Sequence, residues 1–148
     1  MKNKKNERGQ SLVELSISLV LLLMLLAGAV EFGMAFFQFV QLRDAAQEGA
    51  LYGSMNPSDT AGITARIQGA SNSPIDLAGG AVTMSISIDG IASTAGNYNT
   101  VDCEGHGLKV ELTYSHHIFM PFIPQALGRT DIPLKASVTD TILSPVVC

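Results

Sequence analysis

The feature that most constrains this chain is an apolar run close to its N-terminus. Residues 15–30 read LSISLVLLLMLLAGAV, with no charge and with only Ser16 and Ser18 as polar side chains. With its continuation to Val40 the run covers 26 residues, or about 39 Å as a helix. The hydrocarbon core of a bilayer is about 30 Å thick, so a helix of this length can cross it with some tilt. Because residues 20–26 are apolar on every face, a membrane helix is a better interpretation than the buried helix of a small domain.

The distribution of charge predicts how such a helix is oriented. Residues 1–9 carry four basic side chains and one acidic side chain, whereas from Gln41 onward ten acidic residues face five basic ones. Basic flanks of a membrane helix stay in the cytoplasm. We therefore expect a single-pass protein of the cytoplasmic (inner) membrane. It would have a basic cytoplasmic leader at 1–9, a transmembrane helix with its extension at 10–55, and a small extracytoplasmic domain at 56–148. An acidic outer domain gives no reason to expect nucleic-acid binding.

A cleaved secretory signal is the main alternative for the apolar run. It would also have a basic start and an apolar core, and Ala27-Gly28-Ala29 has the small-x-small form of a cleavage site. Two observations count against it: the apolar character continues well past Ala29, and Glu14 interrupts the junction between leader and core. A secreted domain released after Ala29 is the less favoured hypothesis.

The junction between leader and helix has a specific form. The basic leader ends in Gly9, the fifth residue after it is Glu14, and the apolar helix follows at once. This pattern resembles the processing site of type IV prepilins, which a membrane aspartyl peptidase cuts after the glycine. The resemblance implies a cut between Gly9 and Gln10. It also implies that Glu14, a carboxylate that is costly in lipid without a partner, pairs with the new N-terminal amine of a neighbouring subunit. The other interpretation is that Glu14 lies in the headgroup region.

A longer stretch is similar to one family. The run GQSLVELSISLVLLLMLLAGAVEFGMAFFQFVQLRDAAQEGALYG resembles the TadE-like proteins of tight-adherence (Flp/type IVc) pilus assembly. The shared features are the prepilin-type Gly9 and Glu14, a second glutamate in a G-x-x-E-x-G setting (Glu31), and a small-residue helix from Ala45 to Gly53. The resemblance implies a pilin-like minor component of pilus assembly, with a prepilin peptidase, other pilin-like subunits, the assembly machinery and membrane lipid as its partners.

Two further features of the expected helix have more than one interpretation. Glu31 follows Glu14 by 17 residues, about 260° around a helix, so the two glutamates do not share a face. Glu31 either reaches the outer interface, which we favour, or is buried against a partner. Ala45, Gly49 and Gly53 form a line of small residues that permits close helix packing. Either a partner helix or the chain's own sheet can occupy that line.

The rest of the chain predicts an α+β domain. The dipeptide Asn56-Pro57 ends the long helix, and a short second helix is expected at 60–68. Apolar and polar residues alternate at 82–88, 108–115 and 134–139, which is typical of strands with one buried face. Three such strands indicate a small antiparallel sheet, and the outer half of the long helix is its expected cover. We therefore predict a pilin-like fold, with an apolar loop at 118–124 that either closes the base of the domain or dips into the membrane surface.

The remaining residues give little reason to expect catalysis. Cys103 and Cys148 are a possible disulfide, favoured if the domain lies outside the cytoplasm. His116 and His117 point to opposite faces of a strand, so with His106 they are interpreted as surface or strand-end residues rather than a metal site. We expect no enzyme activity, no cofactor or metal and no small-molecule substrate. The alternative function is an adhesive or ligand-binding domain that uses the helix only as a tether.

Overall fold

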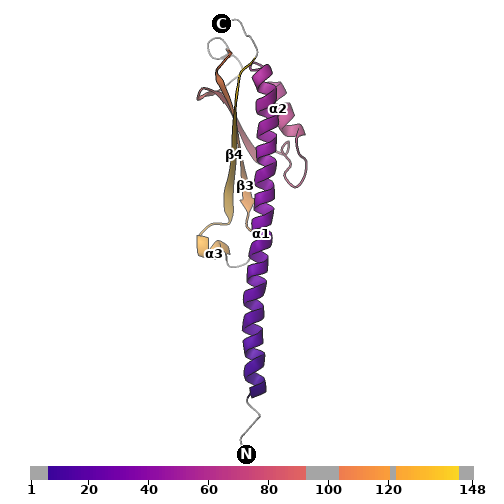
Figure 1. Cartoon of the computed structure of the whole chain (residues 1–148), viewed down its shortest axis with the longest axis vertical. Coiled ribbons are helices and arrows are strands. Elements are labelled where there is room, and N and C mark those ends of the chain that lie inside the picture. Colours follow the sequence, from indigo (N-terminus) through magenta and orange to yellow (C-terminus); the bar gives the residue numbers. More distant parts are fainter. Residues whose placement is uncertain (1–6, 93–103, 121–122, 144–148) are drawn as a thin grey trace, which may run out of the picture.

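The computed structural model describes residues 7–92, 104–120 and 123–143. Its dominant element is α1 (Glu7–Met55), a single helix of 49 residues, about 73 Å long at 1.5 Å per residue. Figure 1 shows that the C-terminal part of α1 lies along the small domain, while its N-terminal part extends away from it with nothing beside it. One unbroken helix therefore joins the apolar segment to the domain.

The end of α1 follows the local sequence. The helix stops at Met55, immediately before Asn56-Pro57, because the residue before a proline is pushed out of the helical region. The second helix, α2 (Thr60–Gly69), begins after Asp59, whose carboxylate Oδ1 accepts the Gly62 N–H at 2.8 Å. This is a typical N-cap, which satisfies one of the free amide groups at the start of a helix.

A four-stranded antiparallel sheet follows. Its strands are β1 (Val82–Ile88), β2 (Ile91–Ala92), β3 (Gly107–His117) and β4 (Asp131–Thr141), in the order β2-β1-β3-β4. The long strands pair without a bulge, so that Ile86 lies beside Val110 and Val110 beside Val138. The predicted α+β fold, a long N-terminal helix on a small antiparallel sheet, is confirmed.

Two short elements were not predicted. The strand β2 forms a hairpin with β1 through Asp89-Gly90, both of which have positive φ, as a tight two-residue hairpin turn requires. The helix α3 (Ile123–Leu127) occupies part of the segment expected to be an apolar loop, of which Ile118–Met120 has no regular structure beyond the end of β3.

The core lies between α1, α2 and one face of the sheet (Figure 1). The inward residues of β3 alternate along the strand and meet the small residues of α1 and the isoleucines of α2. Leu108, Val110 and Leu112 are fully buried, and Tyr114 is half-buried. The main contributors are Leu42, Ala46, Ala50, Ile63, Ile67, Leu108, Val110 and Leu112. The C-terminal part of α1 is thus a core element of the domain.

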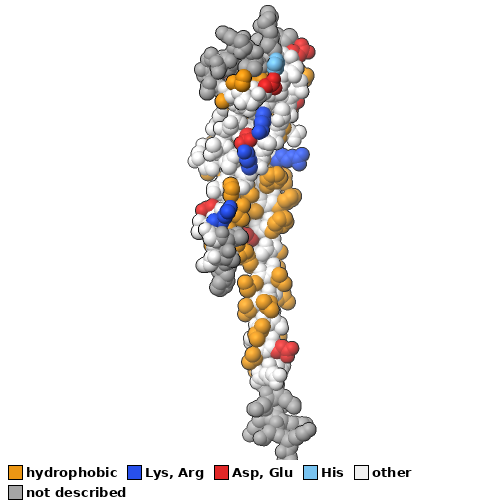
Figure 2. Space-filling model, turned by 90° about the vertical axis from the view of Figure 1, so that its left-hand side faces the viewer, with side chains coloured by type: hydrophobic (Ala, Val, Ile, Leu, Met, Phe, Trp, Pro, Cys, Tyr) orange, Lys and Arg blue, Asp and Glu red, His pale blue; other side chains and the backbone are white. Residues whose placement is uncertain are grey.

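The N-terminal part of α1 has the opposite surface. It is long and apolar enough to cross a membrane, with a mean hydropathy of 2.4 over its best 18-residue window, and none of that window is buried. Large apolar side chains remain exposed from Leu12 to Phe37. Figure 2 shows them gathered along the lower half of the molecule, whereas the charged side chains lie mostly on the upper half. The helix has the properties of a single-pass membrane anchor.

Candidate functional site: two glutamates on the anchor helix

Glu31 lies where the bare part of α1 meets the domain, and its carboxylate is held by the chain's own sheet. Oε1 of Glu31 accepts a hydrogen bond from Nε2 of His116 at 2.9 Å. His116 is at the end of β3 and is almost completely buried, and only 14% of the Glu31 side chain is exposed. The structure therefore places the second helix glutamate in a buried contact with a residue 85 positions away.

A second side chain of α1 holds the same imidazole. Oε1 of Gln38 lies 2.6 Å from Nδ1 of His116. Gln38 follows Glu31 by seven residues, which is two helical turns, so both side chains leave α1 on one face. The imidazole of His116 therefore bridges two side chains of α1, Glu31 and Gln38.

The chain after β3 completes the contact. Glu31 Oε1 also accepts the backbone N–H of Phe119 at 3.2 Å. The next residue, Met120, packs on α1 with its methyl group 3.6 Å from the position that a Cβ would take on Gly28. The Glu31 clasp, defined as Glu31, Gln38, His116 and the Phe119 amide, thus fastens the lower end of the sheet to α1.

The Glu31 clasp offsets the energetic cost of a carboxylate within an apolar helix. A carboxylate within an apolar helix is costly unless it is paired or hydrogen-bonded. Glu31 has two donors from its own chain, of which one is an imidazole, and charge-assisted hydrogen bonds of this kind are stronger than neutral ones. Within the described residues Glu31 therefore has the donors that a buried carboxylate needs.

Glu14 is in the opposite situation. Its side chain is exposed, and it makes no hydrogen bond or ion pair with any residue that the structure describes. It lies 17 residues before Glu31 on the same helix, about 26 Å lower at 1.5 Å per residue. Among the described residues, nothing offsets the cost of placing this carboxylate beside lipid.

The expected processing residues lie at the start of α1. Gly9 and Gln10 are helical and exposed, and a Cβ on Gly9 would meet no atom within 4 Å. A protease that binds an extended substrate would need the first turn of α1 to open. The first turn of a helix frays most easily, because its amide groups have no partner within the helix.

The line of small residues is occupied within the chain. Ala45, Gly49 and Gly53 are buried. A Cβ on Gly49 would lie 2.5 Å from Cγ1 of Ile67 in α2, and a Cβ on Gly53 would lie 2.9 Å from Cδ1 of Leu108 in β3. The glycines thus permit α1 to approach α2 and the sheet closely, and this surface is not exposed to another subunit.

Sequence reasoning missed the role of His116, although a signal for it was present. The inward residues of β3 alternate as Leu108, Val110, Leu112 and Tyr114, and His116 is the next position in that series. The alternation therefore placed His116 on the helix-facing side. His117 points to the other face, where its Nδ1 lies 3.1 Å from Oδ1 of Asp131 on the exposed side of β4. What the alternation could not supply was the partner on α1.

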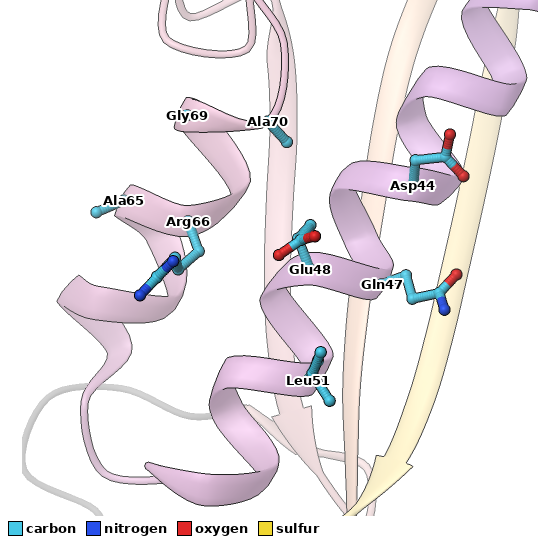
Figure 3. Close-up of a pocket in the computed structure, with 8 residues that line it drawn as sticks. All are labelled: Asp44, Gln47, Glu48, Leu51, Ala65, Arg66, Gly69 and Ala70. Carbon is cyan, nitrogen blue, oxygen red and sulfur yellow. The ribbon is translucent and has the colours of Figure 1, made fainter.

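The groove between α1 and α2 is another candidate site, but its polar side chains do not form a cluster. The groove is open and has a volume of about 680 Å³, and Figure 3 shows the residues that line it. Glu48 points toward α2, whereas Asp44 and Gln47 point away from it, and no set of polar groups converges in the groove. Arg66 instead lies over the ring of Tyr52, 5.2 Å from its centroid. The groove has no arrangement suited to catalysis.

The remaining expectations concern metals and cysteines. Across residues 7–92, 104–120 and 123–143, no group of three or more histidine, cysteine, aspartate or glutamate side chains could hold a metal ion. The proposed disulfide partners, Cys103 and Cys148, lie outside the described residues.

Comparison with known proteins identifies the helix. Residues 9–51 match the family described as TadE-like protein. No curated protein and no solved structure matches the chain. The matched segment lies entirely within α1 and contains Gly9, Glu14, Glu31 and Gly49, but it does not extend to the sheet residues of the clasp. The anchor helix of this chain is therefore a TadE-like domain, of a family associated with tight-adherence pilus assembly.

Proposed function

We propose that this protein is a pilin-like minor subunit that acts in the assembly of a tight-adherence pilus while anchored in the cytoplasmic membrane. Its basic leader lies in the cytoplasm and its α+β domain lies outside. The observation that carries the proposal is the contrast between the two glutamates of α1. Glu31 is held by its own domain, whereas Glu14 is exposed on a bare apolar helix without a partner among the described residues.

The packing of α1 supports an assembly role over a simple tether. Leu42, Ala46 and Ala50 are buried in the domain core, so the helix cannot be removed without exposing that core. A tether that only holds a binding domain at the membrane does not need to share its helix with the domain. A subunit whose helix positions the domain relative to neighbouring helices does need this continuity.

Glu14 provides the proposed link between subunits. Cleavage between Gly9 and Gln10 by a prepilin peptidase leaves a free amine at Gln10, about one helical turn from Glu14. In an array of parallel helices, the amine of one subunit and the carboxylate of its neighbour can then pair. Such a pair removes both charges from uncompensated contact with lipid. Other pilin-like subunits and the assembly machinery are the proposed partners.

The first test is the N-terminus of the mature protein, measured by mass spectrometry of membranes from cells that contain the peptidase. The expected chain begins at Gln10. Gly9→Leu is expected to keep its leader, while Gly33→Leu, the same change at an exposed helical glycine with no atom within 4 Å of a Cβ, is expected to be processed normally. An unprocessed parent chain would show that the prepilin interpretation is wrong.

The second test separates the two glutamates. Glu14→Gln keeps the shape of the side chain and removes its charge, so we expect normal membrane insertion but loss of cross-linking to other pilus subunits. A Glu14→Gln protein that cross-links and assembles like the parent would exclude the proposed role of this carboxylate. Glu14→Asp is the matched control, because it keeps the charge and shortens the side chain by one methylene.

A further inference from the structure

The base of the domain lies beside the apolar part of α1. The base is defined here as Ile118–Met120 together with α3, and Figure 1 shows α3 next to α1 at the level where the bare helix begins. Two contacts fix this level. Met120 packs at Gly28, and the Phe119 amide donates to Glu31. The base is therefore level with residues 28–31 of α1.

This level falls within the bilayer for any position of an upright anchor. The exposed apolar surface of α1 extends from Leu12 to Phe37, which is 26 residues. A hydrocarbon core of about 30 Å takes up about 20 residues of an upright helix. Every window of that length within 12–37 contains residues 18–31. The level of Gly28 and Glu31 is thus at the edge of the hydrocarbon core or inside it.

One exposed side chain of the base, that of Phe119, suits such a position. Phe119 is 70% exposed although it is an aromatic residue. Its ring meets the His117 ring edge to face, with 5.4 Å between the two ring centroids. Its neighbours Ile118 and Met120 are buried, so Phe119 alone of these three is turned outward. Its backbone N–H already donates to Glu31, which removes the cost of bringing that one donor into an apolar environment.

We propose that the base is a second membrane contact, in which Phe119 enters the phospholipid interface beside α1. The proposal rests on the membrane anchoring of α1. Because α1 is part of the domain core, helix and domain move together, and the anchor alone leaves their tilt against the membrane free. Two contacts fix that tilt and so fix which face of the domain is turned toward the membrane. Phe119 and the Glu31 clasp thereby set the orientation in which the domain meets its partners.

The chain contains no tryptophan, so a single introduced tryptophan reports on one position. The full-length protein is reconstituted in phosphatidylcholine vesicles with brominated acyl chains, which quench tryptophan on contact. Phe119→Trp tests the base. Leu21→Trp, in the middle of the apolar run, is the positive control. Leu143→Trp is the negative control, because Leu143 is 64% exposed and bonds to Ser54 at the far end of α1. Each variant is used only if its urea unfolding midpoint matches that of the parent.

The expected result is quenching of Phe119→Trp within a factor of about two of Leu21→Trp, and none for Leu143→Trp. If Leu21→Trp is quenched and Phe119→Trp is not, the base contact is wrong while the anchor stands. If Leu21→Trp itself is not quenched, the anchoring is wrong. A third outcome is that lipid does not quench the tryptophan at 119 and that aqueous acrylamide quenches it only after the protein is diluted in the membrane. This outcome would mean that a second copy of the chain covers the base, and it would overturn the proposal.

Discussion

The Glu31 carboxylate and the His116 imidazole lie 2.9 Å apart, and they join the membrane-proximal part of α1 to the end of β3. The pair lies below the main hydrophobic core, near the contact of Gln38 with His116 and the packing of Met120 on Gly28. The contact therefore determines how far down the helix the domain stays attached. Its loss is expected to free the base of the domain before the core unfolds.

Removal of the imidazole should destabilise the domain. His116→Ala leaves the Glu31 carboxylate without its imidazole donor, and removing one partner of a buried charged group costs about 3 kcal/mol. Urea unfolding of the full-length protein in detergent micelles, followed by circular dichroism, measures the loss. In the double variant Glu31→Ala/His116→Ala, the loss should be smaller than the sum of the single losses by about 1–3 kcal/mol. Strict additivity would mean that the two side chains do not interact.

The two glutamates should differ in their effect on folding. Glu31→Gln replaces the carboxylate that accepts from His116 and from the Phe119 amide with a neutral amide oxygen, which is a weaker acceptor, so the free energy of unfolding should fall. Glu14 makes no hydrogen bond or ion pair with another described residue, so the free energy of unfolding of Glu14→Gln should stay within about 0.5 kcal/mol of the parent, as for most surface substitutions. The same micelle measurement compares them. Equal losses for the two variants would contradict the assignment of Glu31 alone to the fold.

The glycine at position 49 should be sensitive to a single methyl group. Gly49→Ala places a Cβ 2.5 Å from Cγ1 of Ile67 and forces α1 and α2 apart. The expected loss is about 1–3 kcal/mol, typical of overpacking. Gly33→Ala is the matched control. It makes the same change in the same helix with no atom within 4 Å, so its free energy of unfolding should be unchanged or rise by up to about 1 kcal/mol.

A second set of variants separates overpacking from other causes. Ile67→Ala removes the atoms that the new methyl group would meet. If the clash explains the loss, Gly49→Ala/Ile67→Ala should be more stable than the sum of the two single changes predicts. An additive result would point to a cause other than contact with Ile67.

The N-cap residue of α2, Asp59, should make the stability of the domain fall at acidic pH. The Gly62 N–H and the Tyr52 hydroxyl both donate to Asp59 and hold the pKa of its carboxyl below its usual value. A depressed folded-state pKa means that the stabilisation is complete above the unfolded pKa of about 3.9 and is lost as the pH falls through the folded pKa. Thermal unfolding between neutral and strongly acidic pH should therefore show a smaller decrease for Asp59→Ala than for the parent. An equally steep decrease in both would exclude this cap as a source.

Tyr52, which donates to Asp59, should make the stability of the domain fall at alkaline pH. The hydrogen bond to Asp59, followed by burial, raises the pKa of Tyr52 above its usual value of about 10. Here the neutral phenol is the stabilised form, so the contribution is present at neutral pH and is lost as the pH rises through the folded pKa. Tyr52→Phe should remove this alkaline loss, which an absorbance titration of the phenolate can follow. An unchanged alkaline transition would assign the loss to another group.

Much of the architecture followed from local patterns. The apolar run predicted the long helix, the Asn56-Pro57 dipeptide its end at Met55, and the alternation at 82–88 a strand with the bounds found in the structure, whereas the helix begins at Glu7, three residues before the expected start. Such patterns determine which face of an element must leave water. The two-residue strand β2 was not predicted, because it is too short for alternation to be recognised. The helix α3 was not predicted either, because its five residues lie in a segment with two prolines.

By itself, then, the sequence determined that the chain has one apolar helix too long for its domain, followed by strands with one buried face. It also marked Gly9, Glu14 and Glu31 as unusual. Only the tertiary structure decided that Glu31 belongs to the fold while Glu14 remains exposed. The reason is physical: both are carboxylates in apolar surroundings, and their difference depends on whether a donor from elsewhere in the chain reaches them. His116 reaches Glu31 from 85 residues away, because β3 runs down along α1 and ends at its level.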